Sequence, residues 1–122
     1  MRATLVLLLP LLAIALAGCA SSTTTTSSGP AATVTAMSDA SGMRFSPVSV
    51  TIHKGETVLF QVQSGHHTVD FDNETLGASN RHSGDLGPQQ TFAVQFSQPG
   101  TFHFTCKYHA AMGMTGTVVV EA

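Results

Sequence analysis

The chain is short and almost neutral: its 122 residues include five Lys or Arg and seven Asp or Glu, giving a formal net charge of −2. No basic cluster is present, which excludes nucleic acid as a partner. The length suits one small domain with its own core, and we expect a monomer.

The N-terminal segment is basic and then apolar. Arg2 precedes an apolar run over residues 5–16, which is too short to span a bilayer comfortably. Residues 1–18 are therefore predicted to be a secretory signal peptide. The run ends in "LAGC", which resembles the lipobox of bacterial lipoproteins, where Cys19 would be lipidated and become the first mature residue. An ordinary signal peptide with a chance cysteine is the alternative.

A polar, low-complexity segment, "ASSTTTTSSGPAAT", follows at residues 20–33. It carries no charge and almost no large apolar side chain, so it cannot bury enough surface to order itself. We assign residues 19–33 to the lipidated cysteine and a tether, or to a glycosylated stalk serving the same purpose. Residues 34–122 are the working domain, which the lipid anchor would hold on the extracytoplasmic side of a bacterial membrane, periplasmic or at the cell surface.

Apolar residues alternate with period two along the rest of the chain, which predicts β-strands. Val48, Val50 and Ile52 share one face, and the turn signal "KGET" separates this run from "TVLFQV". A short helix between residues 73 and 86 is an option. We predict an all-β Greek-key β-sandwich of about seven to eight strands. The other runs are "HTVDF" (67–71), "TFAVQF" (91–96), "TFHFTC" (101–106) and "GTVVV" (116–120).

Cys106 is the most informative single residue. Once Cys19 is lipidated, Cys106 would be the sole thiol of a secreted domain, where disulfides are normal and a lone thiol is a liability. Alternation in "TFHFTC" puts Cys106 in phase with Phe102 and Phe104, so its sulfur should point to the core at a strand end. The thiol is therefore either buried and inert or occupied by a ligand.

Soft metal-binding residues gather around this cysteine. "TCKYHAAMGM" supplies His109, Met112 and Met114, and "GHHTVDF" supplies two further histidines. A thiolate, two imidazoles and a weak thioether form the donor set of blue-copper electron-transfer sites. Taken singly, each residue has an ordinary structural explanation, such as a core cysteine or a loop histidine. Zinc takes similar ligands, but a methionine as fourth ligand disfavours it.

Residues 45–122 resemble a cupredoxin of the plastocyanin, halocyanin and pseudoazurin type. The family pattern "H-N/T-V-x-F" matches His67 to Phe71, which selects His67 over His66. The pattern "G-T-Y/F-x-F/Y-x-C-x-x-H" matches Gly100 to His109. The resemblance implies one type 1 copper ion held by His67, Cys106, His109 and a methionine.

Two departures from the family concern neighbours of these ligands. Tyr108 stands where members often have Pro, and Thr68 stands where they often have Asn. Both alter the surroundings that orient the ligands and tune the reduction potential, and neither removes a ligand.

Two methionines compete for the weak axial position. Met112 and Met114 lie three and five residues after His109, and both spacings occur among cupredoxins. In the family the axial Met typically lies two residues before the glycine that opens the closing strand, here Gly116. This favours Met114 as the axial ligand and leaves Met112 at the rim of an apolar docking patch beside His109.

The resemblance implies a one-electron carrier and not an enzyme, since no substrate-binding constellation is visible. Expected partners are redox proteins such as a c-type cytochrome or a membrane or periplasmic oxidoreductase. A copper storage or delivery protein is the alternative, but the Thr-rich tether lacks the Met or His clusters that exchange metal. A metal-free sandwich used for adhesion, or as an accessory subunit, is the third class.

Overall fold

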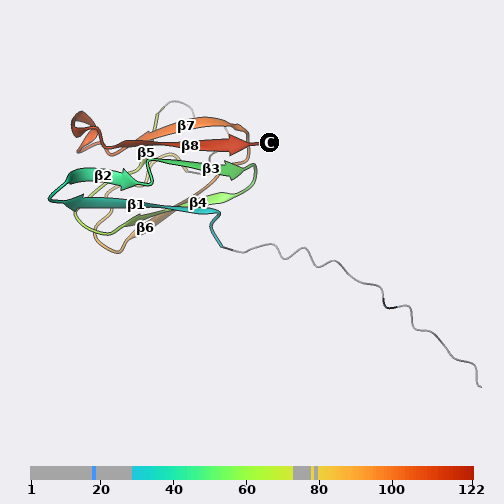
Figure 1. The fold of residues 1–122 in the computed structure, drawn as a ribbon, viewed down its shortest axis with the longest axis horizontal. Helices are drawn as coiled ribbons and strands as arrows, with labels where there is room; N and C mark the ends of the chain where they lie inside the picture. Colours follow the sequence, from blue (N-terminus) through green and yellow to red (C-terminus); the bar gives the residue numbers. More distant parts are fainter. Residues whose placement is uncertain (1–17, 19–28, 73–77, 79) are drawn as a thin grey trace, which may run out of the picture.

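The computed structural model describes residues 18, 29–72, 78 and 80–122. Cys19 and most of the predicted signal peptide and tether lie outside these residues. The described chain forms a two-layer β-sandwich of eight strands with one short 3-10 helix (Figure 1). The predicted all-β Greek-key sandwich is therefore confirmed. No helix in the described residues is long and apolar enough to cross a membrane.

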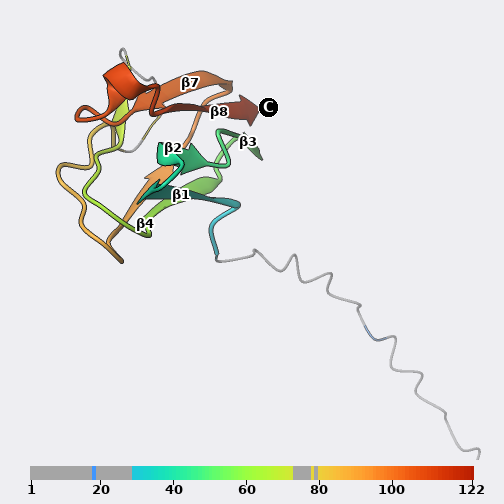
Figure 2. The same ribbon diagram turned by 60° about the vertical axis from the view of Figure 1, so that its left-hand side comes forward.

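Each layer is a four-stranded sheet. One has the strand order β2-β1-β4-β6 and the other β3-β8-β7-β5, and Figure 2 shows the second sheet stacked above the first. The pairs β1–β4 and β3–β8 are parallel, and the remaining neighbours are antiparallel. The bounds are β1 Ala32–Asp39, β2 Gly42–Ser46, β3 Ser49–His53, β4 Thr57–Val62, β5 Asp70–Phe71, β6 Thr91–Gln95, β7 Gly100–Thr105, η1 Ala110–Met112 and β8 Thr115–Glu121.

The core lies between the sheets and follows from the alternation of the strands. In β4, for example, Val58, Phe60 and Val62 are buried while the residues between them are more exposed. Phe104 is at the aromatic centre, with its ring centroid 4.9 Å from that of Phe45 and 5.0 Å from that of Phe60, both edge to face. Such pairs add about 0.5–1.5 kcal/mol each beyond their buried area. This packing fixes β7, the strand that leads to Cys106.

Several elements differ from the sequence prediction. β1 begins at Ala32, two residues inside the segment assigned to the tether, and neither β1 nor β2 was predicted. Val48 is 61% exposed, because it lies in the bend between β2 and β3 and the alternation begins only at Ser49. "HTVDF" contributes just the two residues of β5. The optional helix lies partly outside the described residues, and residues 80–86 form bridges and bends.

Gly116 lies opposite Phe104 in the β7–β8 pairing and leaves room for its ring. A Cβ atom on Gly116 would lie 2.3 Å from Phe104 Cζ and 2.8 Å from the Val48 carbonyl oxygen. We expect Gly116→Ala to lower the free energy of unfolding by about 1–3 kcal/mol, the usual cost of overpacking a core. Denaturant unfolding would measure the loss. Gly29→Ala, where a Cβ meets nothing within 4 Å, is the control and should have no such effect.

Candidate metal centre

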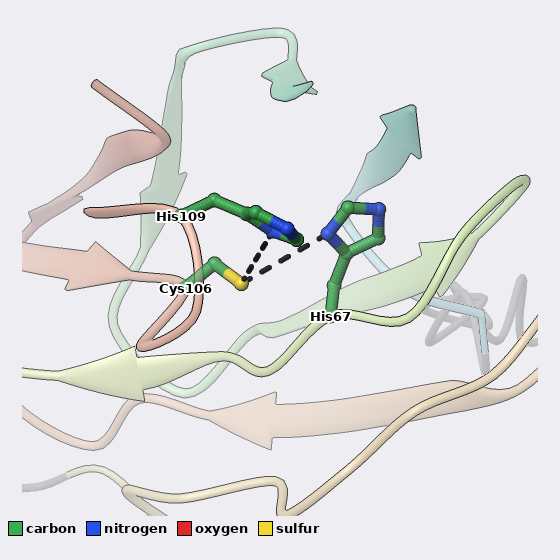
Figure 3. A group of neighbouring side chains, drawn as sticks. All are labelled: His67, Cys106 and His109. Carbon is green, nitrogen blue, oxygen red and sulfur yellow. Dashed lines mark hydrogen bonds between the residues drawn. The ribbon is translucent and has the colours of Figure 1, made fainter. Parts of the chain in front are cut away.

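Three of the predicted ligands meet at one end of the sandwich. His67 lies between β4 and β5, Cys106 directly follows β7, and His109 lies in the turn before η1. Their ligand atoms all lie within 4.8 Å of one another. Figure 3 shows both imidazole rings directed at the sulfur: Cys106 Sγ is 3.9 Å from His67 Nδ1 and 3.4 Å from His109 Nδ1.

Cys106 is fully buried, as its phase on β7 predicted. It is a free cysteine and forms no disulfide within the described chain. Its main-chain N–H donates to the Met114 carbonyl at 3.1 Å, and the main-chain N–H of Thr68 donates to its sulfur at 3.4 Å. The sulfur is therefore shielded from solvent, with one hydrogen-bond donor and two ring nitrogens around it.

His67 is also fully buried, and its main chain exchanges two hydrogen bonds with Leu86, at 3.0 and 2.8 Å. Its Nε2 lies 2.9 Å from the Ser64 carbonyl oxygen and 3.1 Å from Ser38 Oγ. Because a carbonyl oxygen only accepts, Nε2 carries the proton, and Nδ1 keeps its lone pair toward Cys106. Burial lowers the pKa of His67, which favours the neutral ring that a metal ligand requires.

His109 is partly exposed and is held by a tight turn. Its main-chain N–H donates to the Cys106 carbonyl at 3.1 Å. Its own carbonyl accepts from the main-chain N–H groups of Met112 and Met114 at 2.9 and 3.3 Å. Its ring centroid lies 5.2 Å from that of His67. Of the three clustered side chains it alone reaches the surface, since the other two are fully buried.

The neighbouring residues fasten the outside of this turn to the segment before β6. The exposed Tyr108 donates its hydroxyl proton to the Asp85 carboxylate, and this bond raises the pKa of Tyr108. Lys107 Nζ lies 5.0 Å from the centroid of the Tyr108 ring and 3.9 Å from Asp85. These contacts among Tyr108, Lys107 and Asp85 form a surface clamp. Members of the family often have a proline at the position of Tyr108, and a proline has no hydroxyl to donate to Asp85.

The two methionines differ in exposure. Gly113 ends η1 with a φ of 80°, a left-handed conformation that glycine adopts without strain. On either side of this turn Met112 is 68% exposed and Met114 is fully buried. Met114 is also bonded through its main chain to both Cys106 and His109. These positions suit the axial and rim roles predicted for the two thioethers, which remain predictions.

Thr68 is the second departure from the family, and it is buried beside the sulfur. Its hydroxyl oxygen accepts a hydrogen bond from the main-chain N–H of Lys107 at 2.9 Å, and the hydroxyl donates to the Asp70 carboxylate at 2.5 Å. Sequence reasoning did not identify Asp70 or Ser38 as contacts of the site. The spacing of Thr68 and Asp70, two residues apart in an extended segment, was the only available signal for the first. His53, His82 and His103 are exposed and lie outside the cluster.

The donor chemistry of the cluster fits copper. A buried thiol and two imidazoles, held by hydrogen bonds, supply the soft and borderline donors that copper prefers. The main-chain bonds at all three positions would hold these donors in place whether the metal is oxidised or reduced.

Comparison with known proteins agrees with this chemistry. The sequence model of copper-binding proteins of the plastocyanin/azurin family matches residues 31–121. A chloroplastic plastocyanin of Physcomitrium patens is 34% identical over 114 residues, covering 88% of this chain and 68% of that protein. Oxidised plastocyanin from Dryopteris crassirhizoma superposes with a TM-score of 0.59 at 30% identity, covering 73% of this chain and 99% of the other. A copper(I) form of an amicyanin mutant has a TM-score of 0.64 at 24% identity, covering 76% of this chain and 84% of the other, a likeness of fold.

Proposed function

Because this chain belongs to the plastocyanin/azurin family of copper-binding proteins, the cupredoxins, we propose that it carries single electrons between redox proteins at an extracytoplasmic membrane surface. Cupredoxins are electron-transfer proteins rather than enzymes, and copper is their cofactor. We also propose which residues hold the copper, which surface docks partners, what kind of partner docks there and where the protein is located.

The observation that carries the proposal is the buried Cys106 sulfur between two ring nitrogens. When bound, copper supplies a one-electron couple between its copper(II) and copper(I) states. Cys106, His67 and His109 would hold it, with Met114 as the weak axial donor. Each of these residues is fixed by main-chain hydrogen bonds, so the pocket needs little rearrangement when the charge of its occupant changes.

The exposed edge of His109 is the proposed path by which electrons enter and leave. Ala110, Ala111 and Met112 form η1 beside it, and all three are exposed. Such a small apolar surface suits brief contact with a partner, because transient redox complexes bury less than about 1,200 Å². A c-type cytochrome or a membrane or periplasmic oxidoreductase is a partner of the expected kind.

The test is the visible spectrum and voltammetry of the copper-loaded protein. We expect an intense thiolate-to-copper absorption band and a reversible one-electron wave. A copper storage or delivery protein would instead release its metal quickly to a chelator, whereas two fully buried donors should make release slow. Absence of the band, or rapid copper loss from the reduced protein, would count against an electron carrier.

The location is proposed from the lipobox at Cys19, which lies outside the described residues. Lipid burial contributes about 0.8 kcal/mol per methylene group, so a protein needs two or more acyl chains for stable anchoring. Cys19→Ser should block lipidation and leave the protein in the soluble fraction or unprocessed. Membrane fractionation of cells with an antibody to the domain measures this. A mature-length mutant that still pellets with membranes would show that the anchor is elsewhere.

A further inference from the structure

Hydrogen bonds to the side chain and the main chain of Thr68 link the protein surface to the sulfur of Cys106. His82 Nδ1 lies 3.0 Å from Asp70 Oδ1, and Asp70 Oδ2 accepts the Thr68 hydroxyl at 2.5 Å. The same hydroxyl oxygen accepts the Lys107 N–H at 2.9 Å. The main-chain N–H of Thr68 then donates to Cys106 Sγ at 3.4 Å.

We propose that Asp70 is a positioning residue of the metal centre, which acts through Thr68 to fix the surroundings of the Cys106 sulfur. The inference rests on the proposed ligand role of Cys106. It concerns a carboxylate that touches neither the sulfur nor a ring nitrogen of the cluster.

The Thr68 hydroxyl takes part in two hydrogen bonds. A hydroxyl has one proton and two lone pairs, and it rotates to suit its neighbours. The Lys107 N–H needs a lone pair, so the hydroxyl proton of Thr68 must point elsewhere. A carboxylate only accepts, so Asp70 accepts the hydrogen bond of the Thr68 hydroxyl, which leaves a lone pair of Thr68 Oγ1 facing the main-chain N–H of Lys107. Thr68 is fully buried, which leaves few other partners for the proton.

The oriented hydroxyl joins two segments of the chain. Lys107 directly follows Cys106, and Thr68 directly follows His67, so their bond ties together the two segments that carry these side chains. Asp70 also pairs with Thr105 in the register of β5 and β7, which reinforces the connection. With the Lys107 bond made, Thr68 is held where its N–H reaches the sulfur.

The hydrogen bond from the Thr68 N–H acts on the sulfur of Cys106. An N–H donor stabilises negative charge on a thiolate, and hydrogen bonding around the cysteine sulfur is one of the factors that tune blue-copper potentials. Weakening this bond should leave more charge on sulfur for donation to the metal, favour copper(II) and lower the potential. His82 is 62% exposed, so it orients Asp70 from the solvent side and should matter less than Asp70 itself.

The test compares Asp70→Leu, which removes the acceptor, with Asp70→Asn, which keeps an acceptor oxygen. In the metal-free protein, hydrogen exchange measured by NMR should be about tenfold faster at the Lys107 amide in Asp70→Leu, since loss of one buried hydrogen bond corresponds to roughly that factor. Asp70→Asn should restore slow exchange. Unchanged exchange of the Val118 amide in β8 would show that the fold is intact. Wild-type exchange at Lys107 in Asp70→Leu would overturn the proposal.

A second arm tests whether Thr68 is the intermediary. Asparagine carries a fixed carbonyl acceptor that needs no carboxylate to orient it, so in a Thr68→Asn background Asp70→Leu should leave the Lys107 amide unaffected. An equal effect of Asp70→Leu in both backgrounds would overturn the assignment.

The copper-loaded proteins provide the readout at the sulfur. Asp70→Leu should shift the thiolate-to-copper band and lower the potential, and Asp70→Asn should stay close to the wild type. An unchanged band and potential in Asp70→Leu would also overturn the proposal. If the wild type itself has no such band, the proposed function fails, while the exchange rates of the metal-free protein still decide whether Asp70 positions Thr68.

Discussion

Replacing Cys106 with Ser should abolish the intense visible band of the copper-loaded protein. The band requires charge transfer from a thiolate, and no other free cysteine lies in the described chain. Serine is close to cysteine in size, so the buried pocket and the main-chain bond from Cys106 to Met114 should persist. We expect the band to disappear and copper affinity to fall, because a hydroxyl is a harder and weaker donor for copper than a thiolate.

Absorption after copper titration measures the effect, and circular dichroism checks that the sandwich is retained. Met112→Gln is a suitable control, since it changes an exposed sulfur near the site and should keep the band. An unchanged intense band in Cys106→Ser would mean that this thiol is not the source of the colour, and the proposed ligand set would then be wrong.

Substituting Met114 should change the reduction potential far more than substituting Met112. The amide oxygen of glutamine is harder than a thioether, so Met114→Gln should favour copper(II) and lower the midpoint potential. We expect a drop of about 60 mV or more, which corresponds to a tenfold change in the relative stability of the two oxidation states for one electron. The balance of the visible bands should change as well.

Met112→Gln is the matched comparison, because the side chain of Met112 is 68% exposed whereas that of Met114 is fully buried. Its potential should stay near the wild-type value, while the rate of electron exchange with a partner changes through the altered docking patch. Voltammetry of both mutants decides the assignment. A large drop in Met112→Gln with no change in Met114→Gln would show that the other sulfur is the axial ligand.

The sequence was sufficient for those strands that carry a large apolar residue at every second position. β4, β6, β7 and β8 carry regular runs of Val and Phe, and their buried faces were predicted. β1 was missed because its two fully buried residues are the small Val34 and Ala36, set among Thr and Ser in a stretch that reads as polar. Its burial depends on parallel pairing with β4, a long-range contact that leaves no local pattern.

The residues of the candidate site also fall into two groups, those that the sequence predicted and those that it did not. His67, Cys106 and His109 were chosen from motifs with short, specific spacings, and the structure brings them together. The residues that hold these three side chains in place could not be predicted from short motifs. Ser38 reaches His67 from a strand 29 residues away, and Asp85 reaches Tyr108 from 23 residues away. Such partners are determined by how strands pair, and strand pairing is a property of the whole sandwich.

The parallel pairing of β1 with β4 gives the domain a direction. Ala32 at the start of β1 pairs with Val58, and the far end of β1 reaches Ser64 and His67. Eight extended residues span roughly 25 Å, so the chain enters the sandwich at the pole remote from the metal centre. If Cys19 is the membrane anchor, the domain is attached to the membrane through the end that lies away from the metal centre. The metal centre would then face away from the membrane, where soluble partners can reach it. It would reach a partner in the same membrane only if the whole domain tilted.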